Sequence, residues 1–272
     1  MKSIRDFQKV ILTYWREHGR HNLPWRATKD PYHILVSEIM LQQTQVHRVI
    51  PYYKQFLKRF PTVRKLARSN LVTVLKLWSG LGYNRRAKYL RDAAIDIVKK
   101  NKGKFPHSYD ALRALPGIGD YTAKAVRVFA YNEPDILIET NIRTVFIYHL
   151  FAYRFMRGRA RRDMVSDSAI LEIAVRAAEG QDPREWHWAL MDYGAYLKRS
   201  GIKLNHKSAH YTKQSKFEGS LRQVRGAILR TLSRGENIMG LRNPYIERFD
   251  RALASLERDG LISKKKGKWR IS

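Results

Sequence analysis

Apolar residues recur along the first 198 residues at the three- to four-residue spacing of amphipathic helices. Ile4, Phe7, Ile11 and Trp15 form one such stripe. Strand-like alternation is missing until the last dozen residues, so the main body is predicted to be all-α. The predicted helices cover residues 2–18, 31–45, 46–59, 62–67, 70–78, 83–101, 108–114, 120–131, 139–153, 164–179 and 183–198.

The pattern changes near the C-terminal end. Residues 199–216 are polar and basic with little apolar periodicity, which indicates a linker. Residues 220–233 and 243–259 then predict two helices, and residues 261–272 predict a strand, a turn and a returning strand. This order is typical of a winged helix-turn-helix. A helical dimerisation tail is the alternative, because only one helix precedes the recognition-like helix.

Charge and cysteine content narrow the class of protein. Lys and Arg total 53 against 24 Asp and Glu, a formal net charge of +29, which favours nucleic acid as the partner over membranes or acidic proteins. Lys264, Lys265 and Lys266 place part of that charge in the C-terminal turn, where phosphate contact is expected. There is no cysteine, which excludes thiolate zinc sites, cysteine nucleophiles and cysteine-bound iron–sulfur clusters.

The chain has no apolar run long enough to cross a bilayer and no secretory core at its start. It is therefore expected to be soluble and intracellular. The location that we predict is the cytoplasm of a prokaryote, in association with the nucleoid.

A glycine-containing turn joins the predicted helices 108–114 and 120–131. Its sequence is Leu115-Pro116-Gly117-Ile118-Gly119. Glycines here allow positive φ angles and let backbone N–H groups approach a phosphate, while the next helix presents its N-terminal end. We interpret the segment as a helix-hairpin-helix that grips DNA without reading sequence. An ordinary interhelical turn is the alternative.

A second segment places a carboxyl group in a mostly apolar helix. Glu38 lies between Ile34-Leu35-Val36 and Ile39-Met40-Leu41, where burial would make it a possible proton donor near neutral pH. An exposed helical glutamate is the alternative. Gln42 and Gln43 follow at the end of the predicted helix, and their amides could hydrogen-bond base edges.

Several segments, in this order and spacing, give the chain a specific family resemblance over about residues 1–198. They are Leu23-Pro-Trp-Arg26, Ser37-Glu-Ile-Met-Leu-Gln-Gln-Thr-Gln-Val46, Trp78-Ser-Gly-Leu-Gly-Tyr83, Leu115-Pro-Gly-Ile-Gly119, Glu139-Thr-Asn141 and Trp188-Ala-Leu-Met-Asp-Tyr-Gly194. With them the chain resembles the MutY-like adenine DNA glycosylases of the endonuclease III, or HhH-GPD, superfamily.

The resemblance implies a two-lobed helix-hairpin-helix glycosylase domain over residues 1–198, with the flipped base bound between the lobes. One lobe of six helices would cover about residues 27–130, and the other residues 1–26 and 131–198. Residues 199–216 would form a basic linker in place of the iron–sulfur loop. The fold is then all-α, with a small winged-helix-like α+β module for DNA binding over residues 217–272.

The resemblance also implies catalytic roles. Glu38 would protonate the adenine ring, and Glu139 would stabilise the developing sugar cation, a pairing of carboxyl groups that suits glycosidic cleavage. Tyr121 stands where bifunctional relatives carry a Schiff-base lysine, so a monofunctional enzyme is expected. Lys124, one helical turn later, is the alternative source of lyase activity. Asn141 matches a position near the sugar.

Further positions are expected to contact DNA. Gln43 matches a residue inserted into the base stack, and Tyr83 matches a wedge beside the lesion partner, although Tyr83 could equally be a core aromatic. The complete set of expected DNA contacts is Arg26, Gln42, Gln43, Thr44, Tyr83, Leu115, Gly117, Ile118, Gly119, Lys264, Lys265 and Lys266.

Three departures separate this chain from the family pattern. Glu139 replaces the usual aspartate. The stretch from Lys198 to about Lys216 lacks the four cysteines of the iron–sulfur cluster, so no cofactor is expected beyond a possible structural monovalent cation at the hairpin. The domain that recognises 8-oxoguanine is missing, with the C-terminal module in its place.

The leading hypothesis is therefore a monomeric, monofunctional glycosylase of base excision repair. It would bind double-stranded DNA and excise adenine opposite 8-oxoguanine or guanine. A thymine or uracil glycosylase acting on mispairs with guanine is the first alternative. A non-catalytic lesion-binding protein is the second, suggested by the aspartate-to-glutamate change and the added basic module.

Overall fold

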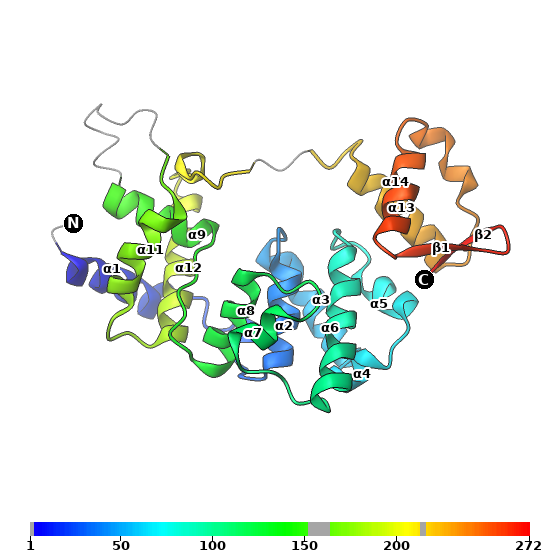
Figure 1. Ribbon diagram of the computed structural model, residues 1–272. Coiled ribbons are helices and arrows are strands. Elements are labelled where there is room, and N and C mark those ends of the chain that lie inside the picture. The colour runs from blue at the N-terminus through cyan, green and yellow to red at the C-terminus, as the bar shows by residue number, and fades with distance from the viewer. Residues whose placement is uncertain (1–2, 152–163, 213–215) are drawn as a thin grey trace. The chain divides into compact units, whose positions relative to one another are not determined.

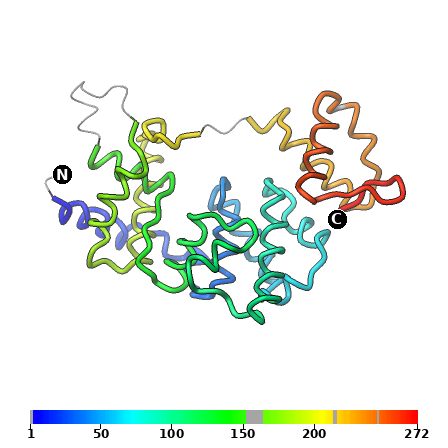
Figure 2. Tube along the Cα trace, in the orientation of Figure 1, coloured from blue at the N-terminus to red at the C-terminus, as the bar shows by residue number. Residues whose placement is uncertain are grey.

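The computed structural model describes residues 3–151, 164–212 and 216–272, and its main body is helical, as predicted (Figure 1). The chain forms two compact units, one from residues 1–31 and 119–213, the other from residues 32–118 and 214–272. Each unit therefore combines an early and a late segment of the chain, which can be followed by colour in Figure 2.

The first unit contains helices whose ends are marked by polar caps. Ser3 begins the first helix by accepting a hydrogen bond from the Asp6 amide, and Asp182 begins the last by accepting one from Glu185. The helices are α1 (Ile4–His18), α8 (Asp120–Val126), α9 (Thr140–Phe146), α11 (Asp167–Ala178) and α12 (Pro183–Arg199). Shorter turns are η1 (Pro24–Arg26), η2 (Arg127–Tyr131), η3 (Ile147–Phe151) and η4 (Asn205–Lys207).

Helix α12 is the central element of this unit and packs against both α1 and α9. Phe7 of α1 contacts Phe146 of α9 at a ring distance of 5.2 Å and Trp186 of α12 at 6.0 Å. A Cβ atom on Gly194 would lie 2.3 Å from the Asn141 carbonyl oxygen. Glycine at that position therefore lets the start of α9 approach α12 closely.

The π-helical turns η2 and η3 extend α8 and α9, so the helices predicted over 120–131 and 139–153 correspond to continuous helical stretches as far as residue 151. The last two residues of the second prediction lie outside the described residues. Part of the predicted linker packs on the first unit, because Val165 forms a β-bridge with Ser208, which is buried.

The second unit contains the helices between the two segments of the first, and they match the predicted ranges to within four residues. Phe56, Leu66, Trp78 and Leu90 fill its core, each less than 2% exposed. The helices are α2 (Pro31–Leu41), α3 (Val46–Arg59), α4 (Val63–Ala67), α5 (Leu71–Trp78), α6 (Arg85–Asn101) and α7 (Tyr109–Arg113).

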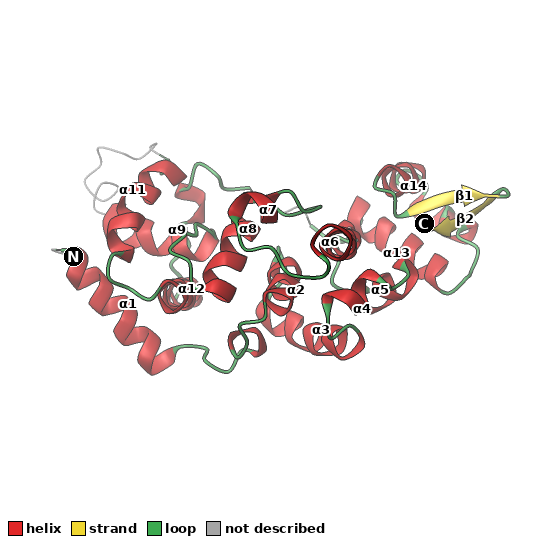
Figure 3. Cartoon of the chain, turned by 60° about the horizontal axis from the view of Figure 1, so that its bottom comes forward, coloured by secondary structure: helices red, strands yellow, loops and turns green. Residues whose placement is uncertain are grey.

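The C-terminal module belongs to this second unit and has the predicted winged-helix order (Figure 3). Its elements are α13 (Leu221–Ser233), η5 (Met239–Leu241), η6 (Asn243–Tyr245), α14 (Phe249–Arg258), β1 (Ile262–Lys265) and β2 (Lys268–Ile271). The strands pair antiparallel, with Lys264 opposite Trp269. Lys266 and Gly267 both have positive φ, as a tight two-residue hairpin turn requires. The helix predicted over 243–259 is wrong at its start, since α14 begins at Phe249.

Two features are missing from the described residues. No helix in them combines the length and apolar character needed to cross a bilayer. They also contain no cluster of three or more histidine, aspartate or glutamate side chains that could hold a metal ion.

Candidate active site

Glu38 lies in a helix that is buried on nearly all sides. Its residue is 8% exposed, and neighbours on either side along α2, including Leu35 and Ile39, are almost fully buried. The sequence allowed either a buried or an exposed glutamate at this position, and the structure shows that Glu38 is buried. Burial shields it from bulk water, as a proton donor to a bound base requires.

The turn after α2 differs from the prediction. The helix was expected to continue to residue 45, but it ends at Leu41, and Gln43 has a φ of 54°. Glutamine has no special tolerance for that left-handed conformation, so the surrounding structure must hold it there. Gln42, Gln43 and Thr44 consequently lie in an irregular turn, and the Gln43 side chain is exposed.

Arg86 holds this turn, a role that sequence reasoning missed. Its Nη1 donates to the carbonyl oxygens of Ile39 (2.8 Å), Met40 (3.1 Å) and Gln42 (2.5 Å), and its Nη2 donates to Gly82 (3.1 Å). The guanidinium lies over the rings of Trp78 and Tyr83, and burial lowers the Arg86 pKa to about 10. One cation thus caps α2 and joins it to the turn before α6.

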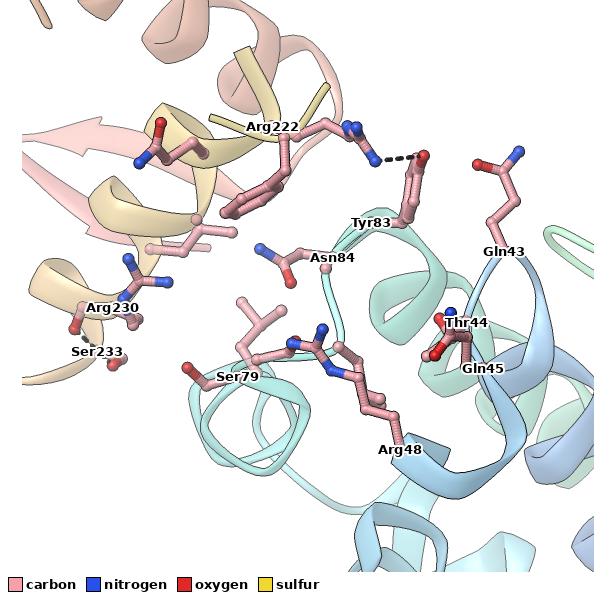
Figure 4. Close-up of a pocket in the computed structure, with 18 of the residues that line it drawn as sticks. Gln43, Thr44, Gln45, Arg48, Ser79, Tyr83, Asn84, Arg222, Arg230 and Ser233 are labelled. Carbon is pink, nitrogen blue, oxygen red and sulfur yellow. Dashed lines mark hydrogen bonds between the residues drawn. The ribbon is translucent and has the colours of Figure 1, made fainter. Parts of the chain in front are cut away.

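A cavity of about 680 Å³ opens beside these two turns, and α13 of the C-terminal module forms its other wall (Figure 4). Tyr83, with a φ of 50°, lines it together with Gln43. Arg222 of α13 donates a hydrogen bond to the Tyr83 hydroxyl (2.8 Å) and lies over its ring. The described residues that line this cavity include arginines, amides and aromatic rings but no carboxylate: they are Gln43, Thr44, Gln45, His47, Arg48, Leu75, Ser79, Gly80, Leu81, Gly82, Tyr83, Asn84, Phe217, Arg222, Gln223, Gly226, Leu229, Arg230 and Ser233.

The two glycines of the hairpin, Gly117 and Gly119, differ in backbone conformation. Gly117 has a φ of 74°, and an added Cβ atom would lie 2.5 Å from Tyr89, so glycine is required there. Gly119 has an extended backbone instead of a positive φ, and open space surrounds its Cβ position. Of the two glycines, Gly117 therefore supplies the positive φ, and Gly119 leaves the start of α8 unobstructed. Leu115 and Ile118 are buried and anchor the turn.

Glu139 is the N-cap of α9, so its carboxylate is held by the chain itself. Oε1 accepts hydrogen bonds from the backbone amides of Asn141 (2.7 Å) and Ile142 (3.0 Å). Oε2 accepts from the Thr140 hydroxyl (3.0 Å) and from Asn141 Nδ2 (3.2 Å). Two residues predicted to act near the sugar are thus in direct contact, and the glutamate fills the capping role that aspartate commonly fills.

The segment before Glu139 is fixed by a buried histidine. His187 of α12 donates from Nδ1 to the Pro183 carbonyl (2.7 Å) and accepts at Nε2 from the Leu137 amide (3.1 Å). Burial lowers the pKa of His187 to about 4, so the ring is neutral at pH 7. Sequence reasoning missed this residue, since a histidine in a helix gives no signal of a contact 50 positions away.

This arrangement predicts a loss of stability on mild acidification. The unfolded chain binds the His187 proton near pH 6.5, whereas the folded chain binds it near pH 4, so the free energy of unfolding should fall as pH decreases through that window. The loss from this one group is at most roughly 3 kcal/mol. Urea unfolding between pH 7 and 4.5 measures it. His187→Phe should show a shallower pH dependence, and an unchanged slope would contradict the assignment.

Other expected site residues lie in different surroundings. Arg26 pairs with Asp192 (2.8 Å), its side chain is 4% exposed, and it lies over the rings of Trp15 and Trp188. These contacts identify it as a stabilising residue within the first unit. Tyr121 is in the first turn of α8, and Lys124 forms an ion pair with Asp120 (3.1 Å). Lys264, Lys265 and Lys266 are exposed in the C-terminal hairpin.

Comparisons with known proteins identify relatives of this chain among DNA repair enzymes. Residues 36–176 match the family described as HhH-GPD superfamily base excision DNA repair protein. The chain is 35% identical over 277 residues to an adenine DNA glycosylase of Mycolicibacterium smegmatis, covering 93% of this chain and 92% of that protein. It is 46% identical over 141 residues to an adenine DNA glycosylase of Buchnera aphidicola subsp. Baizongia pistaciae, covering 52% of this chain but only 40% of that protein.

The fold has a solved counterpart in a thermostable thymine-DNA glycosylase, with a TM-score of 0.61 and 26% sequence identity over 76% of this chain and 96% of that one. Helical architecture, hairpin and sequence together define a DNA glycosylase of base excision repair. The chain belongs to the HhH-GPD superfamily.

Proposed function

We propose that this protein is a monofunctional DNA glycosylase that removes adenine mispaired with 8-oxoguanine or guanine and leaves an abasic site. The observation that carries the proposal is Glu38, a carboxyl group buried in α2 directly before the turn of Gln42, Gln43 and Thr44. Protonating a purine ring makes it a leaving group, which is the task of a shielded acid. The names of two relatives, both adenine DNA glycosylases, support the same choice of base.

In the proposed mechanism the target nucleotide leaves the base stack, because its glycosidic bond is unreachable inside a duplex. Glu38 donates a proton to the base, and the bond between the base and C1′ breaks. Glu139 stabilises the positive charge that develops on the sugar, since its fixed carboxylate needs no reorganisation during the reaction. Water then adds to C1′ and releases a proton to solvent, from which the Glu38 carboxylate takes up a proton and returns to its acid form.

The cavity beside Tyr83 is proposed to receive the DNA strand opposite the excised base. Its arginines suit phosphates, its aromatic rings suit stacking, and Gln43 offers an amide to a base edge. The exposed lysines of the C-terminal hairpin would add phosphate contacts. We propose that the protein acts on mispaired double-stranded DNA as a monomer.

A monovalent cation at the hairpin stays a prediction. The carbonyl oxygens that would be candidate ligands already accept hydrogen bonds within the chain, Leu115 from the Ile118 amide and Ile118 from the Arg113 guanidinium (2.5 Å).

The experiment that tests the choice of base is a single-turnover panel of duplexes carrying A:8-oxoG, A:G, T:G, U:G or only normal pairs. We expect release from the two adenine mispairs and little from the others. Fastest release from T:G or U:G would instead establish the second candidate, which the likeness to a thymine-DNA glycosylase favours.

The DNA product should be an intact strand with an abasic site. Tyr121 has no amine, so it cannot form the Schiff base that links base loss to strand cleavage. Denaturing gels before and after alkali measure this, and breaks should appear only after alkali. Borohydride trapping of the wild-type protein on DNA, lost in Lys124→Ala, would show instead that Lys124 serves as the nucleophile.

A further inference from the structure

We infer that Lys198 is a positioning residue for the catalytic carboxylate Glu139 and acts on it through the Asn141 side chain. The inference rests on the proposed function, because it assigns Glu139 to the reaction. Lys198 is the first residue of the stretch that lacks the cluster cysteines, and in a basic chain a phosphate contact would be the simplest role for a lysine there. Its contacts in the structure are different.

The packing of α12 brings Lys198 to the start of α9. Gly194 and Lys198 are four positions apart and so lie on the same face of α12. At Gly194 the Asn141 backbone comes too close for any side chain. One turn later, the Lys198 side chain reaches past the same residue, and its Nζ donates to Asn141 Oδ1 at 2.8 Å.

The Asn141 amide links Lys198 to the Glu139 carboxylate by a hydrogen bond at each end. With Oδ1 bound to the ammonium group, the other end of the Asn141 amide donates from Nδ2 to Glu139 Oε2 at 3.2 Å. The cation therefore fixes which way the amide points, and it polarises the amide so that Nδ2 becomes a stronger donor. Without this partner the Asn141 amide would be held only at its Nδ2 end, so it would be a weaker donor and freer to turn away from the carboxylate.

Charge and burial agree with an inward-facing role. Burial lowers the pKa of Lys198, while the negative charge of Glu139 opposes that effect, as expected for an ammonium group turned toward the carboxylate. A second cation, Arg143 of α9, also faces Glu139, but its guanidinium is held by Asp167 of α11 through two hydrogen bonds of 2.6 Å. Lys198, by contrast, is linked to the Glu139 carboxylate through the Asn141 side chain alone.

The test is a double-mutant cycle on single-turnover base release from the preferred mispair. Lys198→Met should slow release about tenfold, the order expected for loss of one charge-assisted hydrogen bond. Its DNA affinity should stay within about twofold of wild type, because the ammonium group of this partly buried residue is bound to Asn141. Asn141→Ala should also slow release, and adding Lys198→Met to it should cause no further loss. Lys9→Met, which changes an exposed lysine of α1 in the same unit, is the matched control and should behave as wild type.

Independent losses that multiply in the double variant would overturn the inference, as would an unchanged rate or a defect confined to DNA affinity. Lys198→Gln, whose neutral amide is one bond shorter than the lysine side chain, replaces Lys198→Met if the latter does not fold, and the same slowing of release is expected. If wild type itself releases no base, the proposed function fails. The same cycle measured on the urea midpoint then still decides whether Lys198 acts through Asn141, because additive shifts would exclude it.

Discussion

Glu38→Gln should abolish measurable base release while leaving affinity for the mispair within a few-fold of wild type. The substitution keeps the size of the buried side chain but removes its transferable proton. A step deprived of its general acid typically slows by ~10²–10⁴. Single-turnover release at saturating enzyme measures the chemical step, and an electrophoretic shift assay measures binding.

Glu172→Gln in α11 is a suitable control, because that glutamate is exposed and lies in the other unit. It should release base at the wild-type rate. Near-normal release by Glu38→Gln would remove Glu38 from the mechanism, and equal losses of affinity and rate would indicate a binding role.

Substitutions of Glu139 should separate its charge from its capping role. Glu139→Gln removes the negative charge beside the sugar cation, so release should fall by about 10²-fold or more while DNA affinity is kept. Glu139→Ala should be at least as slow, and it should also lower stability by about 1 kcal/mol because α9 loses its N-cap. Urea unfolding reports the second effect separately.

Glu139→Asp is expected to retain far more activity than either of these variants. Aspartate is one of the preferred N-cap residues, so the bonds to the Asn141 and Ile142 amides can form again. The carboxylate would move by about one C–C bond, roughly 1.5 Å, while its charge remains. Equal release rates for the Asp, Gln and Ala variants would show that the anion at this position has no part in catalysis.

The sequence predicted the helices well because their determinants are local. Ser3 caps α1, Asp182 caps α12, and the apolar stripe of α1 becomes its buried face. Gly117 was also identified correctly, since its required backbone conformation is one that few other residues adopt. The early end of α2 was missed because nothing about Gln43 as a residue type signals a positive φ.

Residues that act over long sequence separations could not be found in the same way. Arg86 reaches back 47 positions to Ile39, and Lys198 reaches 57 positions to Asn141. Both look like ordinary solvated cations in a basic chain. Their partners follow from how α6 and α12 pack, which helical periodicity does not specify. Arg26 is a related case, because it was expected to contact DNA and its ion pair with Asp192, 166 positions away, could not be read from the sequence.

The most direct test of the central claim is to identify the products of wild-type protein on one duplex that carries A:8-oxoG. Mass spectrometry of a single-turnover reaction should detect free adenine together with a full-length strand that has lost adenine and gained a hydroxyl group at C1′. Release of another base, a strand already cleaved before alkali, or recovery of unreacted duplex at saturating enzyme would contradict the account.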